Sequence, residues 1–507
     1  MERLSKALLE NQNGRVGANN PGEIPERIIQ FGEGNFLRGF IDWMVQQLND
    51  KGLFNGRVVA IQPTPHGKVV PKLNAQDGLY TTVLRGISNG EVVDHSEIIS
   101  SISRGINPYE NWNEVLKVAE NKDIQFVFSN TTEAGLTYMK ETYESDQSPL
   151  SYPGKLTAFL YHRYQVMNGE PESGLTIIPC ELVEDNGALL KALVRKIAKD
   201  WNLSEEFISW VNDENRFCNT LVDRIVTGYP KDNMEEFREK LGYEDVLLTV
   251  GEPYHLLAID AGADLSEKLP FDKVGLNIHW GDVAPFRKLK VRILNGAHTM
   301  MFAVAYLSGC NTVKEAMANE DINSFLTNGI YDEILPIIDY DESEKRIFAN
   351  SVIERFLNPY MNHQLLDISL NSVSKYKIRV LPTLLEYTDK NQGVPDMMSF
   401  SLAALISFYH VKRVENSRYF GIRGEKEYEI RDDQEVLQFF SEQWASYEKN
   451  LVSLEQMVET ILGNQSLWDR DLTQIPLLQE TTSQYLKSIE DAGMNSALSN
   501  VLSASKI

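Results

Sequence analysis

Cysteine and basic residues are scarce in this sequence. Its 507 residues include three cysteines (Cys180, Cys218 and Cys310), which give no disulfide framework and no paired spacing typical of a zinc site. Lys and Arg number 49 against 72 Asp and Glu, and the formal net charge of −23 argues against nucleic acid as a partner. An anionic small molecule must therefore be met by a local cluster of cations, against the overall field of the protein.

Long apolar runs are missing as well. No run approaches the ~18 apolar residues of a membrane span, and residues 1–6 lack the apolar core of a signal peptide. We therefore expect a cytoplasmic protein that does not enter a membrane. The length suggests two or three domains, whereas nothing in the sequence fixes the oligomeric state.

A glycine-rich turn stands near the start of the chain, in residues 27–38 (RIIQFGEGNFLR). A short apolar segment leads into Gly32 and Gly34, and the apolar residues that follow recur with the helical period up to Leu48. With a second strand-like run at residues 57–62, this order is typical of a dinucleotide-binding unit, in which helix N-terminal amides hold the pyrophosphate. The third glycine of the usual fingerprint is missing, so a purely structural turn is the alternative.

The rest of the first half alternates strand-like runs with helical patterns. Further strands are expected at residues 123–128, 175–178, 246–250 and 274–278. Small polar residues, Ser129 to Thr131, follow the first of them. Such residues at the carboxyl end of a strand mark the ligand crevice of an open α/β sheet.

After Lys290 the pattern changes to long helical segments, including residues 403–408, 436–447 and 451–462. Strand-like runs are few in this half. We therefore expect an α/β fold with a Rossmann-type dinucleotide-binding domain and a mainly α-helical C-terminal domain for substrate and catalysis. The expected boundary separates residues 1–285 from residues 286–507.

The clearest catalytic pattern is K-x4-N-x2-H, formed by Lys290, Asn295 and His298. At about 100° per residue of α-helix, Asn295 lies about 140° and His298 about 80° around from Lys290, so the three share one side. A lysine whose pKa falls from ~10.4 toward ~7–8 is a general base that needs no metal. The amide and the imidazole can donate hydrogen bonds to an oxygen whose charge changes. An ordinary amphipathic helix is the alternative.

Five motifs, in this order, resemble the polyol-specific long-chain dehydrogenases/reductases, also called the mannitol dehydrogenase family. They are Gly32–Arg38 (G-x-G-x-F-x-R), Gln76–Thr81 (QDGLYT), Thr132–Gly135 (T-E-x-G), Val222–Ile225 (VDRI) and the Lys290 motif. The resemblance covers most of the chain. It implies metal-independent hydride transfer between a nicotinamide and a secondary alcohol. Lys290 is then the acid/base, Asn295 binds the oxygen, and His298 contacts a neighbouring hydroxyl or helps to hold the site.

The cofactor that the resemblance implies is NAD. The residues expected to bind it are Phe31, Gly32, Gly34, Asn35, Phe36, Arg38, Gln62, Asn130 and Thr131. The acidic residue that usually holds the ribose hydroxyls is missing after the second strand, where Gln62 can bond a hydroxyl instead. NADP is the alternative, because His66 and Lys68 can meet a 2′-phosphate.

Within the family, the sequence is most similar to the hexuronate branch, through residues 355–359, His363 and residues 374–382. This resemblance implies a sugar-acid substrate and the interconversion of D-altronate and D-tagaturonate. The alternatives are a fructuronate, neutral polyol or sugar-phosphate dehydrogenase of the same family. A nucleotide-binding protein without catalysis is a further alternative, against which the intact Lys290 motif argues.

Substrate contacts are expected from Asp223, Arg224, Arg355 and Arg379. A carboxylate favours an arginine in fork geometry, and Arg379 stands in an apolar run where a buried cation needs a partner. Lys375 and Lys377 are weaker candidates, with solvation at the surface as the alternative. For Asp223 and Arg224 the alternative is a buried ion pair that ties the domains together.

One position departs from the mannitol dehydrogenase pattern. The family has an Asp-Asn pair after the cysteine at a strand end, and its Asn is a second oxyanion donor. Here Glu181 and Leu182 follow Cys180, and Leu182 cannot donate. The loss of such a donor costs ~10²-fold in rate, so a replacement is expected, such as Asn186 or a backbone amide; the alternative is an oxyanion hole that is arranged differently. The departure also argues against mannitol as the substrate.

Overall fold

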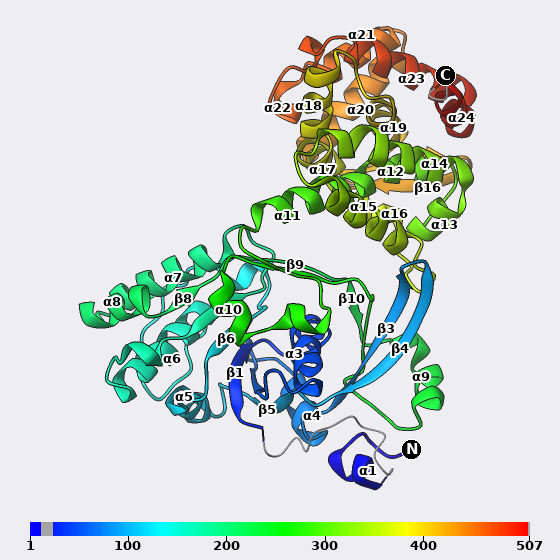
Figure 1. Cartoon of the computed structure of the whole chain (residues 1–507). Coiled ribbons are helices and arrows are strands. Elements are labelled where there is room, and N and C mark those ends of the chain that lie inside the picture. Colours follow the sequence, from blue (N-terminus) through cyan, green and yellow to red (C-terminus); the bar gives the residue numbers. More distant parts are fainter. Residues whose placement is uncertain (12–23, 505–507) are drawn as a thin grey trace. The chain divides into compact units, whose positions relative to one another are not determined.

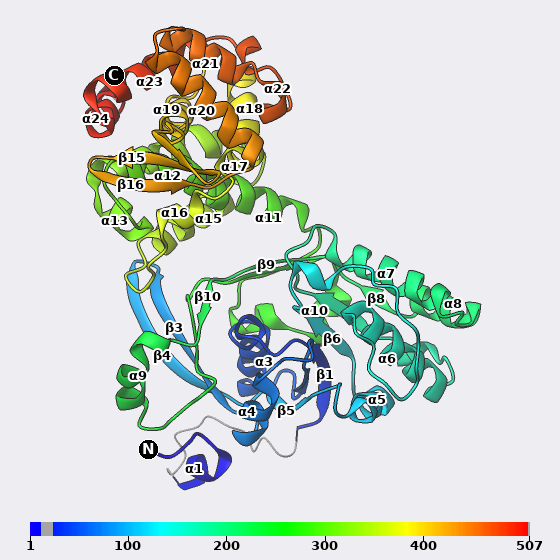
Figure 2. The same ribbon diagram turned by 180° about the vertical axis from the view of Figure 1, so that it is seen from behind.

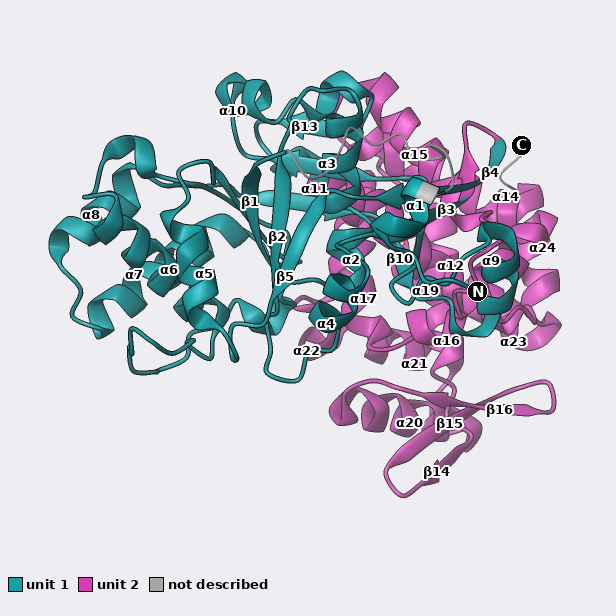
Figure 3. Cartoon of the chain, turned by 90° about the horizontal axis from the view of Figure 1, so that it is seen from below, with its two compact units in different colours: residues 1–85, 91–286 teal, residues 86–90, 287–507 magenta. Residues whose placement is uncertain are grey.

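The structure, a computed structural model, describes residues 1–11 and 24–504. The chain divides into two compact units, coloured separately in Figure 3. Unit 1 comprises Met1–Arg85 and Glu91–Phe286, and unit 2 comprises Gly86–Gly90 and Arg287–Ile507.

Unit 1 is built on a six-stranded parallel sheet (Figure 1). Its strands are β1 (Glu26–Phe31), β2 (Arg57–Ile61), β5 (Ile102–Ile106), β6 (Phe126–Ser129), β7 (Thr176–Pro179) and β8 (Arg216–Phe217). Their order in the sheet is β5-β2-β1-β6-β7-β8. Counting only these strands, the order is 3-2-1-4-5-6, that of the dinucleotide-binding fold. Ligands of such sheets bind where the order reverses, which here is between β1 and β6.

The central strand β1 is buried on both faces. Ile28 belongs to one apolar cluster, and its neighbour Ile29 belongs to the other. This alternation follows from the two-residue period of a strand. The helices that pack on the sheet are α3 (Ile41–Asp50) in the first cluster, and α5 (Trp112–Glu120), α6 (Tyr152–Val166), α7 (Asn186–Asp200) and α8 (Glu205–Asp213) in the second.

The helix expected after the glycine turn is broken in two. α2 (Asn35–Arg38) ends at Gly39, and α3 follows Phe40. The Arg38 carbonyl accepts a hydrogen bond from the Tyr80 hydroxyl at 2.8 Å, a long-range contact that holds the chain in this bend.

Two further sheets complete unit 1. The four-stranded sheet β10-β11-β3-β4 contains β3 (Tyr80–Ser88), β4 (Glu91–Ile99), β10 (Val226–Gly228) and β11 (Thr249–Gly251). The three-stranded sheet β13-β12-β9 contains β9 (Thr220–Asp223), β12 (Leu256–Ile259) and β13 (Ile278–Trp280). The strand expected at residues 274–278 is wrong: residues 271–274 form a 3-10 turn, and the left-handed Gly275 (φ +76°) ends it before β13 begins.

Short helices fill the connections of unit 1. They are α1 (Lys6–Asn11), α4 (Val69–Ala75), α9 (Met234–Leu241), α10 (Ala263–Lys268) and the 3-10 turns η1 (Glu133–Gly135), η2 (Pro171–Ser173), η3 (Lys231–Asn233) and η4 (Phe271–Val274).

Unit 2 is mainly helical (Figure 2). After α11 (Ala284–Leu289), which spans the boundary, its elements are η5 (Lys290–Asn295), α12 (Gly296–Leu307), α13 (Val313–Ala318), α14 (Glu320–Asn328), η6 (Gly329–Ile334), η7 (Leu335–Ile337), α15 (Glu342–Phe356), α16 (Leu365–Ile368), α17 (Ser372–Arg379), α18 (Leu381–Asn391), α19 (Asp396–Phe408), α20 (Gln434–Glu448), α21 (Leu454–Leu462), α22 (Gln465–Trp468), η8 (Leu472–Gln474), α23 (Leu478–Ala492) and α24 (Met494–Ala504). An antiparallel sheet β14 (Arg413–Glu415), β15 (Arg418–Arg423) and β16 (Lys426–Ile430) interrupts them. The expected fold class is confirmed.

Two helices, α12 and α19, form the centre of unit 2. They pack against each other, and almost every residue of both is buried. A helix that is apolar all round needs such cover. Within residues 1–11 and 24–504, none of the helices is long and apolar enough to cross a membrane. The Lys290 motif leads into α12, a closely packed helix that restricts the motion of its backbone.

Candidate active site

The glycine turn of unit 1 lies at the carboxyl end of β1. Gly32 has a φ of +122°, and a Cβ there would lie 2.9 Å from the carbonyl oxygen of Asn130. The Asn130 amide in turn donates to the Phe31 carbonyl at 3.1 Å. Glycine is thus required where the ends of β1 and β6 approach each other, at the reversal of strand order.

Gly34 borders a pocket of about 510 Å³. A Cβ on Gly34 would meet no protein atom within 4 Å, so the turn leaves its backbone open to a ligand. The charged residues that line the pocket are all cations: Arg3, Arg38, Lys72 and Lys231. In a chain of net charge −23, this local excess of positive charge suits a phosphate-bearing ligand.

The side chains of the turn hold it in shape. The Arg38 guanidinium donates to the Glu33 carbonyl at 3.1 Å, to Asn35 Oδ1 at 2.7 Å and to the carbonyl of Leu247. Two aromatic rings of the expected set lie in apolar contacts, with Phe31 against Tyr152 at 5.1 Å and Phe36 on Phe40 at 4.9 Å between ring centroids. The roles of Phe31 and Phe36 in cofactor binding stay predictions. At this turn, contacts with the cofactor are expected from the backbone.

Gln62, at the end of β2, is fully buried. Its Nε2 donates to the Thr64 carbonyl at 2.8 Å, and its Oε1 has no partner in the described residues. The Gln62 side chain packs against the following loop at Gly67. A Cβ on Gly67 would lie 2.5 Å from the Cδ atom of Gln62. Its contact with a ribose stays a prediction.

The ends of β6 and β7 are joined by a buried carboxylate. Glu181, 2 % exposed, accepts hydrogen bonds from Ser129 Oγ at 3.0 Å, the Thr131 amide at 2.9 Å and Thr131 Oγ1 at 3.0 Å. Asn130 Nδ2 donates to the Cys180 carbonyl at 2.7 Å. Thr132, next in the loop, has φ +73° and ψ 166°, a region where strain costs about 1–3 kcal/mol and glycine is the usual residue.

Gly34→Val is expected to weaken NADH binding at least ~10-fold and to leave the melting temperature near that of the wild type. The backbone at Gly34 (φ −69°) accepts any side chain, and the added atoms displace only what binds in the pocket. NADH titration and thermal melting measure the two effects. Gly393→Val is the matched control, because a Cβ there also meets nothing within 4 Å. Wild-type NADH affinity in folded Gly34→Val would place the dinucleotide elsewhere.

In unit 2 the Lys290 motif begins in a π-helix, η5, and continues into α12. Hydrogen bonds from residue i to i+5 widen the turn, so Lys290 and Asn295 come close to the same face. Arg292 lies on another side, where it donates to Thr383 Oγ1 at 2.6 Å and to Glu386 at 2.7 Å. The segment is helical, as expected, and π-helical turns are frequent at functional sites.

The side chains of Asn295 and His298 are available to a ligand. Asn295 and His298 are half-buried, and their side chains make no hydrogen bond within the part of the chain that the structure describes. The His298 ring lies 4.2 Å from the Phe356 ring and 5.2 Å from the His363 ring, between centroids. Lys290 is half-buried on the same segment.

Cations surround His298 within unit 2. Helices α15 and α17 pack against η5; Arg355 lies in the last turn of α15, and Arg379 is the last residue of α17. Burial lowers the pKa of His298 well below its usual value, and the positive fields of His363, Arg355, Arg379 and Lys375 lower it further. The imidazole is therefore neutral near pH 7, and the surrounding charge suits an anionic substrate group.

Arg379 differs from the other cations in its contacts. Its guanidinium is half-buried, its pKa is lowered by burial, and it has no hydrogen bond or ion pair among residues 1–11 and 24–504. By contrast, Lys375 donates to the Ile368 carbonyl at 2.9 Å, and Lys377 pairs with Asp469 at 2.9 Å. Arg355 is 6 % exposed. A desolvated cation without a partner favours an anionic ligand.

We expect the free energy of unfolding to fall as the pH drops below about 6.5, the usual histidine pKa. Between that value and the lowered pKa of His298, the unfolded state binds more protons, so acid favours unfolding. The pKa of His255, lowered to about 4 by burial, acts in the same direction. His298→Asn should reduce the slope by up to ~1.4 kcal/mol per pH unit. Denaturant unfolding at several pH values tests this, and an unchanged slope would contradict it.

Asp223 and Arg224 are both buried in unit 1. Arg224 donates to the carbonyls of Glu252 and Gly39, each at 2.8 Å, and lies 4.2 Å from the Trp43 ring centroid. Burial lowers its pKa to about 9. Carbonyls and an aromatic face hold this guanidinium, and its Nη2 has no hydrogen-bond partner in the described residues. The substrate contacts of Asp223 and Arg224 stay predictions.

Asn186 is excluded as the second oxyanion donor. Its Nδ2 donates to the Pro179 and Glu181 carbonyls and to Thr220 Oγ1, at 3.0–3.1 Å. Leu182 is 61 % exposed and offers no polar group. A backbone amide and a differently arranged oxyanion hole are the alternatives that stay predictions.

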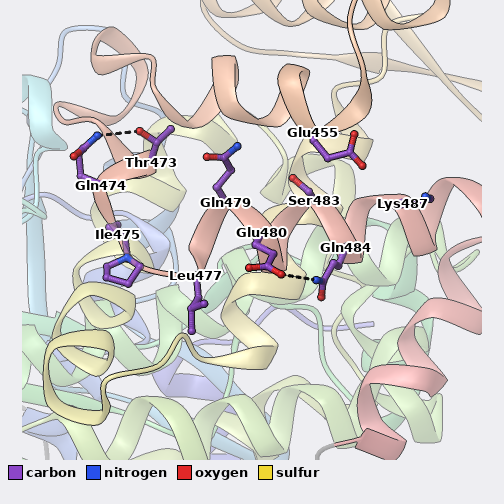
Figure 4. Close-up of a pocket in the computed structure, with 11 residues that line it drawn as sticks. Glu455, Thr473, Gln474, Ile475, Leu477, Gln479, Glu480, Ser483, Gln484 and Lys487 are labelled. Atoms are coloured by element: carbon purple, nitrogen blue, oxygen red, sulfur yellow. Dashed lines mark hydrogen bonds between the residues drawn. The ribbon is translucent and has the colours of Figure 1, made fainter.

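Unit 2 holds a second pocket, of about 700 Å³, beside α21 and α23 (Figure 4). Its amide side chains bond neighbours on its own wall, Gln474 to Thr473 and Gln484 to Glu480. None of the residues expected at the active site lines it. Within the described residues, no group of three or more His, Cys, Asp or Glu is arranged to hold a metal ion.

Two family models match the chain. The mannitol dehydrogenase Rossmann domain matches residues 26–273, and the mannitol dehydrogenase C-terminal domain matches residues 282–490. An altronate oxidoreductase of Halalkalibacterium halodurans is 51% identical over 502 residues, covering 99% of this chain and 98% of its own length. An altronate oxidoreductase of Klebsiella pneumoniae is 43% identical over 481 residues, covering 94% and 97%.

Solved structures share the fold at low sequence identity. A D-sorbitol dehydrogenase in its substrate-free form has a TM-score of 0.78 at 19% identity, covering 98% of this chain and all of its own. The Pseudomonas fluorescens mannitol 2-dehydrogenase, in a ternary complex with NAD and D-mannitol, has a TM-score of 0.66 at 18% identity and covers 99% of each chain. The chain belongs to the mannitol dehydrogenase family, and it is a Rossmann-fold dehydrogenase.

Proposed function

We propose that this enzyme interconverts D-altronate and D-tagaturonate, with NAD as the hydride carrier. The names of the relatives at 51% and 43% identity, both altronate oxidoreductases, support altronate as a substrate, and the hexuronate-branch resemblance supports tagaturonate as its oxidised partner. One observation of this chain carries the proposal: Asn295, His298 and Arg379, close together in unit 2, keep half-buried polar groups without hydrogen bonds in the described residues. Such groups favour a polar, anionic ligand.

The residues of unit 1 fit a dinucleotide. Gly32, Gly34 and the loop at Asn130 would hold it at the reversal of strand order, where Gly34 leaves the backbone open beside a cationic pocket. When bound, the nicotinamide accepts or returns a hydride. We propose NAD because the branch that the sequence resembles uses it.

Lys290 is the proposed acid/base. In the oxidation of altronate, its amine takes the hydroxyl proton while the hydride leaves the same carbon, so the C–O bond becomes a carbonyl and the charges balance. In the reverse direction the lysine returns the proton. Asn295 would donate to the oxygen as its charge changes, and His298, neutral near pH 7, would bond a neighbouring hydroxyl.

The substrate carboxylate is assigned to Arg379, with Arg355 as the second candidate. Charge-assisted hydrogen bonds from a guanidinium are worth ~1.5–3 kcal/mol, and a bidentate pair also fixes orientation. Asp223 is proposed to contact the substrate as well. We further propose a cytoplasmic location, because the three cysteines are free thiols.

A substrate panel tests the proposal. Tagaturonate, fructuronate, neutral ketoses and polyol phosphates are compared by the change in NADH absorbance. We expect the highest kcat/KM for tagaturonate. Higher efficiency with fructuronate would keep the sugar-acid class and change the stereochemistry, whereas higher efficiency with a neutral ketose would overturn the proposal.

A further inference from the structure

A strained loop stands where β6 ends in unit 1. Thr132 has φ +73° and ψ 166°, a conformation that suits glycine, and threonine is β-branched. Thr132, Glu133 and Ala134 are all exposed, so this conformation buries nothing in the core. No core packing therefore compensates for the backbone strain at Thr132. Uncompensated backbone strain of this kind is typical of functional sites.

The residues before Thr132 are held in place by hydrogen bonds. Glu181 accepts hydrogen bonds from Ser129 Oγ at 3.0 Å and from the amide and hydroxyl of Thr131 at 2.9 and 3.0 Å. Asn130 is fixed by the Cys180 carbonyl and by the backbone of β1. The chain thus enters Thr132 in one direction only, and the carboxylate of Glu181 supplies most of the side-chain contacts that fix it.

We propose that Glu181 is a positioning residue for the dinucleotide: it holds the loop from Asn130 to Glu133 in the strained form that meets the ligand. The amides of Thr132 and Glu133 have no acceptor among the described residues, so they are open to a ligand acceptor. The loop stands at the reversal of strand order, beside Gly32. This inference rests on the proposed dinucleotide site.

NADH titration of three variants tests this positioning role. Glu181→Ala should weaken NADH binding ~10-fold, because Thr132 relaxes to an unstrained conformation once Thr131 is released. Glu181→Gln should stay within ~2-fold, since its amide can accept from Thr131 and donate to Ser129. Burial raises the pKa of Glu181, so the neutral amide is a fair mimic. Thr132→Gly keeps the backbone amide and should melt at a higher temperature, because glycine adopts this conformation without strain; its own NADH affinity is the reference for the double variant.

The double variant separates positioning from general destabilisation. In the Thr132→Gly background the loop is no longer strained, so Glu181→Ala should then cost less than ~3-fold. Binding by Glu181→Ala within ~2-fold of the wild type, or the same ~10-fold loss in both backgrounds, would overturn the inference. Where Glu181→Ala does not fold, Ser129→Ala replaces it: Ser129 is fully buried, and its loss should weaken NADH binding ~3-fold.

Glu333→Ala is the matched control. Glu333 is a buried carboxylate of unit 2 that accepts from the amides of Met397 and Met398 at 2.6 and 2.9 Å. Its loss should lower the melting temperature and leave NADH affinity unchanged. A wild-type enzyme that bound no NADH would refute the proposed dinucleotide site itself, whereas wild-type affinity in Glu181→Ala refutes only the positioning role of Glu181.

Discussion

Lys290→Ala is expected to lower turnover by ~10²–10⁴-fold, with NADH binding nearly unchanged. Lys290 is the proposed acid/base of the motif, because Asn295 does not titrate and burial holds the pKa of His298 well below 6.5. Removing the amine leaves hydride transfer without a proton acceptor, and kcat and kcat/KM should fall together. Steady-state rates and NADH titration measure this.

Two controls sharpen that result. Lys288→Ala removes a half-buried lysine two residues earlier, on α11, and should keep turnover within ~2-fold of the wild type. Small primary amines added to Lys290→Ala should restore part of the lost rate, since they replace the missing base. A Lys290→Ala enzyme that retained a tenth of wild-type turnover would refute the acid/base role.

Local patterns predict the dinucleotide-binding core well. The strand before Gly32, the glycine turn and the strand at residues 57–61 depend on contacts between near neighbours in sequence. The hairpin β3–β4 was missed although its Asn89-Gly90 turn, with both residues at positive φ, is a local hairpin signal. The pairing of β3 with β11, by contrast, joins Thr82 to Thr249, far along the chain. No periodicity within either segment specifies such a partner.

The break at Gly39 shows the same limit for a helix. The apolar residues on both sides keep the helical period, and the bend depends on a hydroxyl from β3. The π-helical form of Lys290–Asn295 is likewise invisible to an α-helical period. Its effect is to place Lys290 and Asn295 closer to one face than an α-helix would.

The candidate site was only partly predictable for a related reason. The spacing within one helix identifies Lys290, Asn295 and His298, whereas the approach of Arg355 and Arg379 depends on how α15 and α17 pack against η5. Sequence reasoning treated Glu181 only as a departure from a family pattern. Its three hydrogen bonds become apparent once β6 and β7 are paired.

Arg379→Leu is expected to raise the KM for tagaturonate at least ~10-fold and to leave NADH affinity unchanged. A half-buried guanidinium without a partner in the described residues is positioned for a carboxylate, and leucine keeps the apolar stem while removing the charge. The control on the same helix is Lys377→Leu, which breaks a surface ion pair with Asp469 and should keep the KM within ~2-fold.

The contribution of the carboxylate contact is measured by a thermodynamic cycle. The cycle combines Arg379→Leu with a substrate that lacks the carboxylate. With a neutral ketose such as D-fructose, the kcat/KM of the wild type should be at least ~10-fold lower than with tagaturonate. Arg379→Leu should change the kcat/KM for D-fructose little, because this substrate has no carboxylate to lose contact with. If Arg379→Leu instead lowers kcat/KM equally for tagaturonate and D-fructose, the arginine shapes the pocket and does not bind the carboxylate. Arg355 on α15 is then the next candidate, and the same cycle is repeated with an Arg355 variant. A wild-type enzyme as efficient with D-fructose as with tagaturonate would show that neither arginine binds a carboxylate.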